Sequence, residues 1–280
     1  MPWGSLRGLA WGNPDAPMIL AVHGWLDNAA SFNELAPMLA HEWYLVALDL
    51  PGHGASDHRP AGETYELLDH VRDIAVLLSQ QQREGITFVG HSLGGILGAL
   101  LAAACPERVG RLVMIDSLGP VVGRAEDFPG QLGKALRKIT RGARGEAPVY
   151  GSPEEAVEAR LGGRIPLSRA AAEHIVPRNL IQDGQRWVWR TDPRLRYPSM
   201  HRLEEEEVLA MFRAIQCPVL VAKACQGLMD FMGEIIQPRF EALADGSLCA
   251  FEGGHHFHLD GDVVGLAEEI KRWLDGADLD

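Results

Sequence analysis

Residues 90–94, with the sequence Gly-His-Ser-Leu-Gly, constrain this chain more than any other stretch. The preceding residues, 86–89, are β-branched and aromatic and predict a short buried strand. The following residues, 95–104, are small and apolar and predict a helix that ends before Pro106. A strand, a sharp turn and a helix form the context in which this motif exposes a reactive serine, because its glycines leave room for a strained turn. We therefore predict that Ser92 is a nucleophile rather than part of an ordinary tight turn.

Composition limits the classes of protein that the chain can represent. Its 280 residues, 46% of them hydrophobic, suffice for one large α/β domain with an insertion or for two small domains. The net charge of −12, without a basic stripe, argues against nucleic acid and anionic membranes as partners. The N-terminus lacks the apolar core of a signal peptide, and no run approaches the ~18 apolar residues of a membrane span. We expect a cytoplasmic protein of undetermined oligomeric state.

Cysteine spacing gives little support to a disulfide framework or a zinc site. The four cysteines are scattered and form no Cys-x-x-Cys pair: Cys105, Cys217, Cys225 and Cys249. We therefore expect the four cysteines to be free thiols.

Apolar runs alternate with helical patterns along both ends of the chain. Further strands are predicted over residues 18–22, 44–48, 112–115, 218–222 and 248–251, and helices over 31–40, 65–79 and 263–274. For the first of these helices, Ser31 and Glu34 have the spacing of a capping box. Nearly continuous apolar strands that alternate with helices predict a mainly parallel sheet with helices on both faces.

Residues 118–215 interrupt this alternation. The span is rich in Arg, Glu, Gly and Pro, and Ser152 followed by Pro153 predicts the start of a helix. A second amphipathic helix is predicted over 204–214. We expect a helical lid over 118–215, inserted into an α/β core formed by residues 1–117 and 216–280.

A serine hydroxyl needs a general base, and the histidine-rich loop after the last predicted strand can provide one. His255 follows a pair of glycines and is our candidate. Because His256 and His258 lie close by, a metal site is the alternative, but no matching carboxylate or cysteine set accompanies them. We therefore expect neither a metal ion nor a cofactor.

Two carboxylates compete to orient the imidazole and stabilise its charged form. Asp116 directly ends the strand over 112–115, whereas Asp230 lies eight residues beyond Ala222 at the end of another predicted strand. Both satisfy the order serine, acid, histidine. We favour Asp116 because a longer connection can carry Asp230 away from the site, and Asp230 remains the alternative.

An oxyanion requires two positioned N–H donors. Leu93 follows the nucleophile at the start of a helix and supplies one backbone N–H. The second is expected from the loop after the strand over 18–22, where Trp25 is the candidate. Its indole side chain can equally be a packing element, which does not exclude the backbone role.

Four motifs together resemble the α/β-hydrolase superfamily: His23-Gly24-Trp25, the run 49–57 (Asp-Leu-Pro-Gly-His-Gly-Ala-Ser-Asp), the run 90–95 and Gly254-His255-x-x-His258-Leu259. More narrowly, Trp11-Gly12, the pattern 23–28 and Lys223-Ala224 are similar to the serine hydrolase-like proteins. The resemblance implies a serine, histidine and acid site of esterase type. The position of Asp116 is similar to that of the acid in haloalkane dehalogenases, but Ser92 argues against dehalogenation because those enzymes use an aspartate nucleophile.

The expected activity is therefore cleavage of a small or medium-sized carboxylic ester through an acyl-enzyme. A thioesterase, a lactonase or a cofactor-free perhydrolase uses the same residues and stays open. A small-ligand binder that retains the fold without activity is the alternative from another class, since a fold alone does not establish catalysis. The lid decides the substrate, and its packing cannot be read from the sequence.

Overall fold

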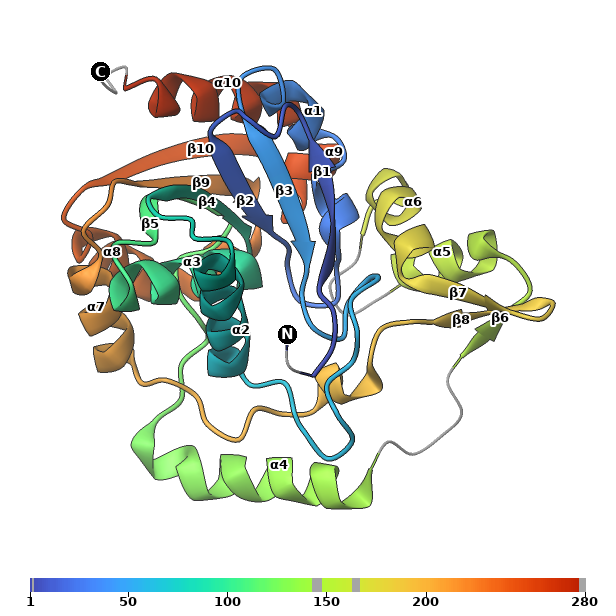
Figure 1. Ribbon diagram of the computed structural model, residues 1–280. Helices are drawn as coiled ribbons and strands as arrows, with labels where there is room; N and C mark the ends of the chain where they lie inside the picture. Colours follow the sequence, from blue (N-terminus) through green and yellow to red (C-terminus); the bar gives the residue numbers. More distant parts are fainter. Residues whose placement is uncertain (2, 143–147, 163–166, 277–280) are drawn as a thin grey trace.

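The chain folds around a seven-stranded sheet, described here from a computed structural model that covers residues 1, 3–142, 148–162 and 167–276 (Figure 1). The strands in chain order are β1 (Arg7–Trp11), β2 (Met18–Val22), β3 (Tyr44–Asp49), β4 (Ile86–His91), β5 (Val109–Ile115), β9 (Val219–Gln226) and β10 (Gly246–Gly254). Their spatial order is β1-β3-β2-β4-β5-β9-β10, and only the edge strand β1 runs antiparallel to its neighbour. The predicted mainly parallel α/β sheet is thus confirmed, with β1 as an addition.

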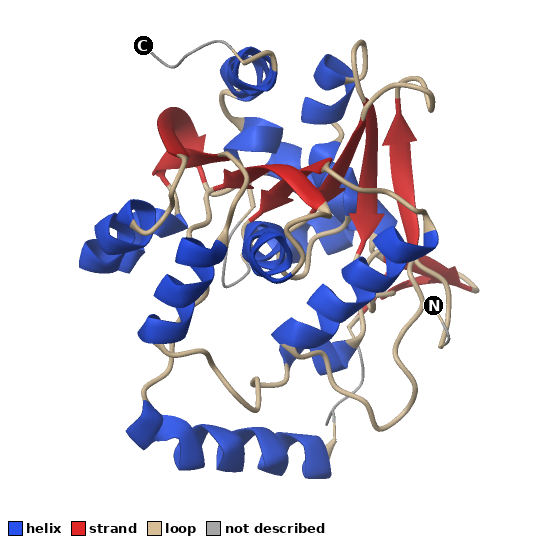
Figure 2. Ribbon diagram, turned by 60° about the vertical axis from the view of Figure 1, so that its left-hand side comes forward, coloured by secondary structure: helices blue, strands red, loops and turns tan. Residues whose placement is uncertain are grey.

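Helices cover both faces of the sheet (Figure 2). One face carries α1 (Leu35–Leu39), α9 (Phe257–Asp260) and α10 (Val263–Leu274), and the other carries α2 (Leu67–Gln80), α3 (Leu93–Ala104), α7 (Glu205–Ala214) and α8 (Ile236–Glu241). Strand alternation produces this sandwich, because Ile19 packs into the first apolar layer while Leu20 packs into the second. Because the six strands other than β1 run in the same direction, their carboxyl ends lie at one edge of the sheet.

The helix predicted over 31–40 is wrong in its start and its cap. A short 3-10 turn, η1 (Ala29–Phe32), precedes α1, and Asn28 caps it by accepting a hydrogen bond from the Ala30 N–H. The Ser31 hydroxyl instead forms a buried hydrogen bond of 2.8 Å with His258 Nε2. A tertiary partner thus takes the side chain that the local pattern assigned to capping.

The span between β5 and β9 contains strands as well as helices. In order it holds η2 (Ala125–Asp127), α4 (Phe128–Arg141), β6 (Val149–Tyr150), α5 (Pro153–Leu161), α6 (Arg169–Arg178), β7 (Leu180–Asp183), β8 (Arg186–Trp189), η3 (Pro193–Arg196) and α7. The three strands form a separate antiparallel sheet, β6-β8-β7. The expectation of a purely helical insertion is therefore corrected: strands of two to four residues are too short to produce a readable periodicity.

Helix starts within this span follow their sequence signals. Ser152 caps α5 by accepting a hydrogen bond from the Glu155 N–H, and Glu204 and Glu207 form a capping box at α7. Helix α7 packs against α3 and so belongs to the layer that covers the central sheet. Among the described residues, no helix combines the length and apolar character needed to cross a membrane. All four cysteines are free thiols.

Candidate active site

Ser92 lies on a strained turn between β4 and α3. Its backbone angles, φ 50° and ψ −114°, fall in a region that residues other than glycine rarely adopt. The turn is compact: a Cβ at Gly94 would lie 1.9 Å from the Val22 carbonyl oxygen, so only glycine fits there. The Ser92 N–H donates to the Ile115 oxygen across the neighbouring strand at 3.0 Å. The serine is thereby held at the carboxyl edge of the sheet, in the geometry that the motif predicts.

Asp116 and His255 meet at the same edge of the sheet. The Nδ1–H of His255 donates to Asp116 Oδ2 at 2.6 Å, and the aspartate side chain is fully buried. Two backbone N–H groups also donate to this carboxylate, Leu228 to Oδ2 at 2.7 Å and Ala224 to Oδ1 at 3.3 Å. These bonds hold the carboxylate in one orientation and leave His255 Nε2 available for another partner. His255 and Ser92 line the same pocket.

Gly227 gives the Asp116 carboxylate its space. A Cβ at position 227 would lie 2.3 Å from both carboxylate oxygens. Its φ of −102° is ordinary for any residue, so the constraint is the close approach and not the backbone angle. Sequence reasoning missed this residue, because nothing in the local pattern indicates that the loop after β9 crosses over the end of β5.

Asp230, the alternative acid, lies elsewhere. It belongs to the 3-10 segment η4 (Leu228–Ile235), and its Oδ1 is 2.6 Å from Lys223 Nζ in a partly exposed ion pair. Strand β9 continues to Gln226, four residues beyond its predicted end at Ala222. The structure therefore brings Asp116, and not Asp230, to His255.

The two candidate oxyanion donors have free N–H groups. Within the described part of the chain, neither the Trp25 N–H nor the Leu93 N–H donates a hydrogen bond. Leu26, next to Trp25, has a φ of 67°, and Asp116 has a φ of 44°. Of the four described non-glycine residues with positive φ, three therefore lie at or beside the candidate site. Such clustering of backbone strain is typical of functional sites.

The histidines of the loop after β10 have different partners. His256 Nε2 donates to Asp27 Oδ2 at 3.0 Å, and His258 Nε2 is bonded to Ser31, while His255 contacts Asp116. The three imidazoles therefore do not converge on one point, as a metal site built from this loop would require.

A different trio does converge. Asp27, His91 and His256 are buried, and each offers one ligand atom within 4.8 Å of the others. His91 Nε2–H donates to the His255 carbonyl oxygen at 2.9 Å, so its unprotonated Nδ1 faces Asp27 Oδ2 at 3.7 Å. Burial alone would raise the pKa of Asp27, but the adjacent His256, together with His23 and Arg160, lowers it below its ordinary value. These atoms are the ones that could hold a metal ion; the bond from His256 to Asp27 also ties the loop that carries Trp25 to the loop after β10.

Two further histidines, His23 and His53, form hydrogen bonds with the backbone of the loop that carries Trp25. His23 Nδ1–H donates to the Gly24 oxygen at 2.7 Å, and its Nε2 accepts from the Leu50 N–H at 3.1 Å. His53 accepts from the Leu26 N–H at 3.2 Å through Nε2. Each arrangement needs a neutral imidazole, since an acceptor nitrogen cannot carry a proton. His53, within the run 49–57, thus positions Leu26, the residue after Trp25.

Acid should destabilise the protein because these imidazoles are buried in the neutral form. Burial lowers the pKa of His23, His53, His91 and His258 below the ordinary value and that of His70 to about 3. A histidine with a lowered folded pKa contributes stability that is complete above the unfolded pKa, about 6.5, and is lost as the pH falls. The free energy of unfolding should therefore decrease below pH 6.5, by about 1.4 kcal/mol per pH unit for each such group.

Urea unfolding at pH 7.5, 6.0 and 5.0 measures this dependence. His70→Leu should flatten the slope by the share of one histidine, whereas the exposed His41→Gln should leave it unchanged. Equal unfolding free energies at pH 7.5 and 5.0 would contradict the expectation.

The pocket beside Ser92 has a volume of about 520 Å³ and is bounded by two parts of the chain. The core contributes Ser92, His255, His256 and residues 24–27. The insertion contributes Pro148, Tyr150, Ala159, Arg160, Trp189 and Arg196. Segments from residues 118–215 thus form one wall of the pocket that contains the serine.

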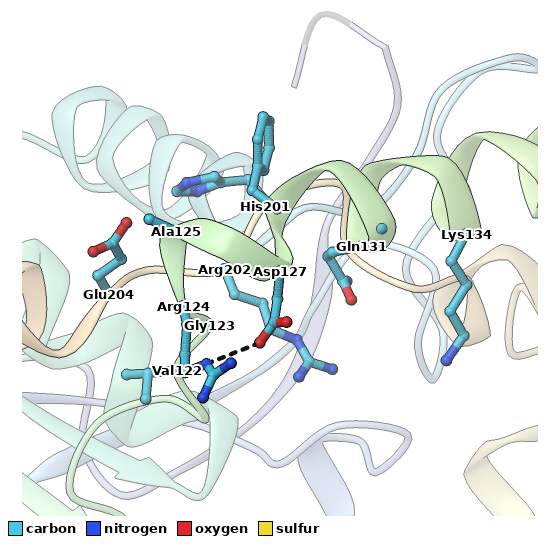
Figure 3. A pocket seen from close by; sticks show the side chains of 12 residues that line it. Val122, Gly123, Arg124, Ala125, Asp127, Gln131, Lys134, His201, Arg202 and Glu204 are labelled. Carbon is cyan, nitrogen blue, oxygen red and sulfur yellow. Dashed lines mark hydrogen bonds and ion pairs between the residues drawn. The ribbon is translucent and has the colours of Figure 1, made fainter.

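A second pocket, of about 570 Å³, lies beside α4 and contains neither Ser92 nor His255 (Figure 3). It is lined by Arg124, Asp127, Lys134, His201 and Glu204 among others, and Arg124 pairs with Asp127. The chemistry at the sheet edge therefore points to the first pocket.

Known proteins share both the sequence and the fold. Residues 17–144 match the family model of the alpha/beta hydrolase fold. A probable serine hydrolase from Drosophila melanogaster is 30% identical over 92% of this chain and 81% of its own length. Serine hydrolase-like protein 2 of Homo sapiens is 30% identical over 82% of this chain and 75% of its own.

Solved structures extend the comparison. A hypothetical protein from Pseudomonas aeruginosa PAO1 superposes with a TM-score of 0.89 at 41% identity, covering 97% of this chain and 95% of that one. The thioesterase domain from the curacin biosynthetic pathway shares the fold, with a TM-score of 0.82 at 22% identity over 96% and 99% of the two chains. Taken with the sheet order and the turn at Ser92, these relatives establish that the chain belongs to the α/β-hydrolase superfamily, among the serine hydrolase-like proteins.

Proposed function

We propose that this protein hydrolyses a carboxylic ester of a small or medium-sized molecule, with Ser92, His255 and Asp116 as its catalytic residues. The observation that carries the proposal is the 2.6 Å hydrogen bond between His255 Nδ1–H and the buried Asp116 carboxylate, in a pocket that also contains Ser92. The bond fixes the tautomer in which Nε2 is a free base. The backbone N–H groups of Trp25 and Leu93, which have no hydrogen-bond partner among the described residues, are proposed as the oxyanion donors.

In the acylation half, Ser92 Oγ attacks the carbonyl carbon and gives its proton to His255 Nε2. The carbonyl oxygen becomes an oxyanion that the N–H groups of Trp25 and Leu93 stabilise. When the bond to the leaving oxygen breaks, Nε2 returns the proton to that oxygen and the alcohol departs. The buried Asp116 carboxylate stabilises the transient imidazolium throughout.

In the deacylation half, water attacks the acyl-enzyme and gives a proton to His255 Nε2. The bond between Ser92 Oγ and the acyl carbon breaks, Oγ recovers the proton, and the carboxylic acid is released. Serine, imidazole, carboxylate and backbone dipoles supply all of these steps, so the proposed reaction needs neither a metal ion nor a cofactor.

The insertion over 118–215 is proposed as the lid that selects the substrate, because Tyr150, Trp189 and Arg160 form its side of the pocket. A thioester, a lactone or a peracid substrate fits the same residues and remains the alternative reaction. The runner-up from another class is a non-catalytic binder of small ligands on the same fold.

A fluorophosphonate probe separates enzyme from binder. We expect covalent labelling of the native protein at Ser92 and none after heat denaturation, located by mass spectrometry of the tryptic peptide. A panel of p-nitrophenyl esters and matched thioesters of rising acyl length then defines the reaction. Labelling at another serine, or none in a folded protein that binds small ligands, would favour the binder.

A further inference from the structure

The pocket beside Ser92 carries positive charge in a chain whose net charge is −12. Two arginines of the insertion line it, Arg160 at the end of α5 and Arg196 at the end of η3. The only aspartate or glutamate of the lining is Asp27, among the described residues. Neither guanidinium has a role in the acyl transfer described above.

Arg160 is mostly buried, with 18% of its side chain exposed. Its guanidinium lies 3.9 Å from Asp27 Oδ1, which is within ion-pair distance but longer than a direct hydrogen bond. Burial lowers the pKa of Arg160, Asp27 opposes this effect, and the like charge of Arg196 lowers it further. The two guanidinium groups are thus close enough to repel each other, and Asp27 is the carboxylate of the lining that lies beside Arg160.

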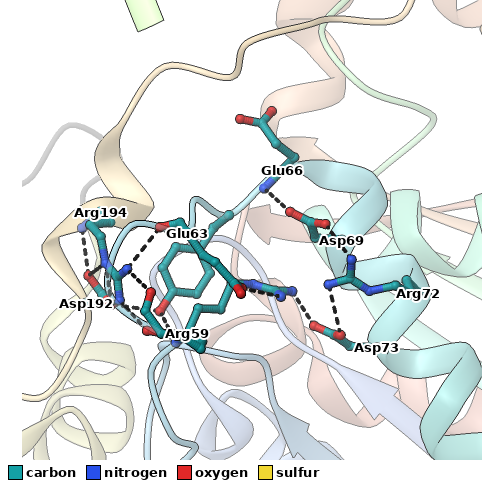
Figure 4. A network of polar contacts seen from close by, with 10 residues as sticks. Arg59, Glu63, Glu66, Asp69, Arg72, Asp73, Asp192 and Arg194 are labelled. Atoms are coloured by element: carbon teal, nitrogen blue, oxygen red, sulfur yellow. Dashed lines mark hydrogen bonds and ion pairs between the residues drawn. The ribbon is translucent and has the colours of Figure 1, made fainter. Parts of the chain in front are cut away.

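Arg196 differs from its neighbour Arg194 in how its side chain is used. Arg194 pairs with the Asp192 carboxylate and donates to the backbone oxygens of Arg59 and Glu63, within a network that also holds Arg59 and Asp73 (Figure 4). In the part of the chain that the structure describes, the Arg196 guanidinium has neither a hydrogen bond nor an ion pair.

The backbone beneath Arg196 is nevertheless fixed. The Asp192 N–H donates to the Gly52 oxygen at 2.9 Å, and Trp25 Nε1–H donates to the Leu195 oxygen at 3.0 Å. Trp25 also carries the proposed oxyanion N–H. The segment before Arg196 is therefore tied to the loop that would hold the reacting carbonyl group, so the backbone places the exposed Arg196 side chain at the wall of this pocket.

We propose that Arg160 and Arg196 form an anion subsite, so that the preferred substrate is an ester that carries a carboxylate or phosphate group. This inference rests on the proposed function for its reaction but not for its binding step. A planar guanidinium donates paired hydrogen bonds that match the oxygens of such a group. Tyr150, Trp189 and Trp25 line the same pocket and would contact the apolar part of the substrate.

Isosteric esters test the proposal. Mono-(4-nitrophenyl) adipate ends in a carboxylate, and 4-nitrophenyl 6-methylheptanoate replaces that carboxylate by an isopropyl group of the same shape. We expect kcat/KM of the wild-type protein to favour the adipate by about 10-fold or more, as a charge-assisted hydrogen bond allows. Added salt should reduce the preference. A second pair places the anion on the leaving group instead of the acyl group. It consists of the hexanoyl esters of 4-hydroxybenzoate and of methyl 4-hydroxybenzoate, and their kcat/KM values are compared in the same way.

Arg196→Glu should abolish or reverse the preference between the members of a pair, and Arg196→Gln should reduce it. Arg213→Gln, which removes an exposed charge on α7 outside the pocket lining, is the matched control and should retain the preference. A wild-type protein that favours the neutral member in both pairs, or an Arg196→Glu variant with an unaltered ratio, would overturn the proposal.

Direct binding keeps the two proposals apart. In Ser92→Ala, which cannot cleave an ester, monomethyl adipate should bind more tightly than methyl 6-methylheptanoate in a calorimetric titration, and the further change Arg196→Glu should remove that difference. If no ester were turned over while this binding difference persisted, the proposed hydrolysis would fail and the anion subsite would stand. Turnover without any anion preference in rate or binding would support the proposed hydrolysis and overturn the anion subsite.

Discussion

Ser92→Ala is expected to lower kcat for p-nitrophenyl esters by about 10⁴-fold or more while the protein remains folded, because no other group can form the acyl-enzyme. His255→Ala should cause a loss of similar size, since the members of such a site act as a unit. Steady-state kinetics together with circular dichroism measure both effects. Near-normal turnover in folded Ser92→Ala would contradict the entire proposed mechanism.

The neighbouring histidines provide matched controls. His256 holds Asp27, and His258 is bonded to Ser31, so neither imidazole is available as the base. His256→Ala and His258→Ala should therefore keep kcat within about 10-fold of the wild type when folded, although both should lower stability by leaving a buried partner unpaired. An inactive His256→Ala beside an active His255→Ala would reassign the base and leave Ser92 in place.

Asp116→Asn should retain the fold and reduce kcat by up to ~10⁴-fold, by analogy with the serine proteases. An amide at this position cannot both accept from His255 Nδ1–H and stabilise the imidazolium as a carboxylate does, so the wrong tautomer is favoured. Asp230→Asn is the control: it removes only a partly exposed ion pair with Lys223 and should have a mild effect. The opposite order of the two variants would show that the acid follows β9.

Gly227→Ala probes the same carboxylate without removing it. The added Cβ would lie 2.3 Å from both Asp116 oxygens, so the carboxylate or the loop at residue 227 must shift, which disturbs the hydrogen bond to His255. We expect kcat to fall by about 10- to 100-fold, since displacement of a catalytic group by 1 Å can have an effect of this size. Gly130→Ala, on the exposed face of α4 with no atom within 4 Å of the new Cβ, should be neutral.

Where the local sequence has a strong periodic pattern, that pattern predicts the bounds of the strand or helix correctly. Strand β2 and helix α10 have the predicted bounds, 18–22 and 263–274, because an apolar run and an amphipathic period specify a strand and a helix without reference to distant residues. Strand β1 is not predicted from the sequence, because it is an edge strand with exposed positions and lacks an apolar run. The turn at Ser92 belongs to the predictable features, since the glycines that permit it are its immediate neighbours.

Contacts between distant segments decided the rest. Asp116 and Asp230 each follow a predicted strand, and only the continuation of β9 to Gln226, with Lys223 as the partner of Asp230, separates their roles. Gly227 and Arg196 owe their places to contacts with segments distant in sequence, at Asp116 for Gly227 and at Trp25, through Leu195, for Arg196. Local sequence patterns predict the layered sheet and the candidate nucleophile, because these depend on periods and turns within about ten residues. Which carboxylate meets the imidazole, and which charges face the serine, was decided by tertiary packing, because burial and hydrogen bonding act between atoms that the chain brings together only when it folds.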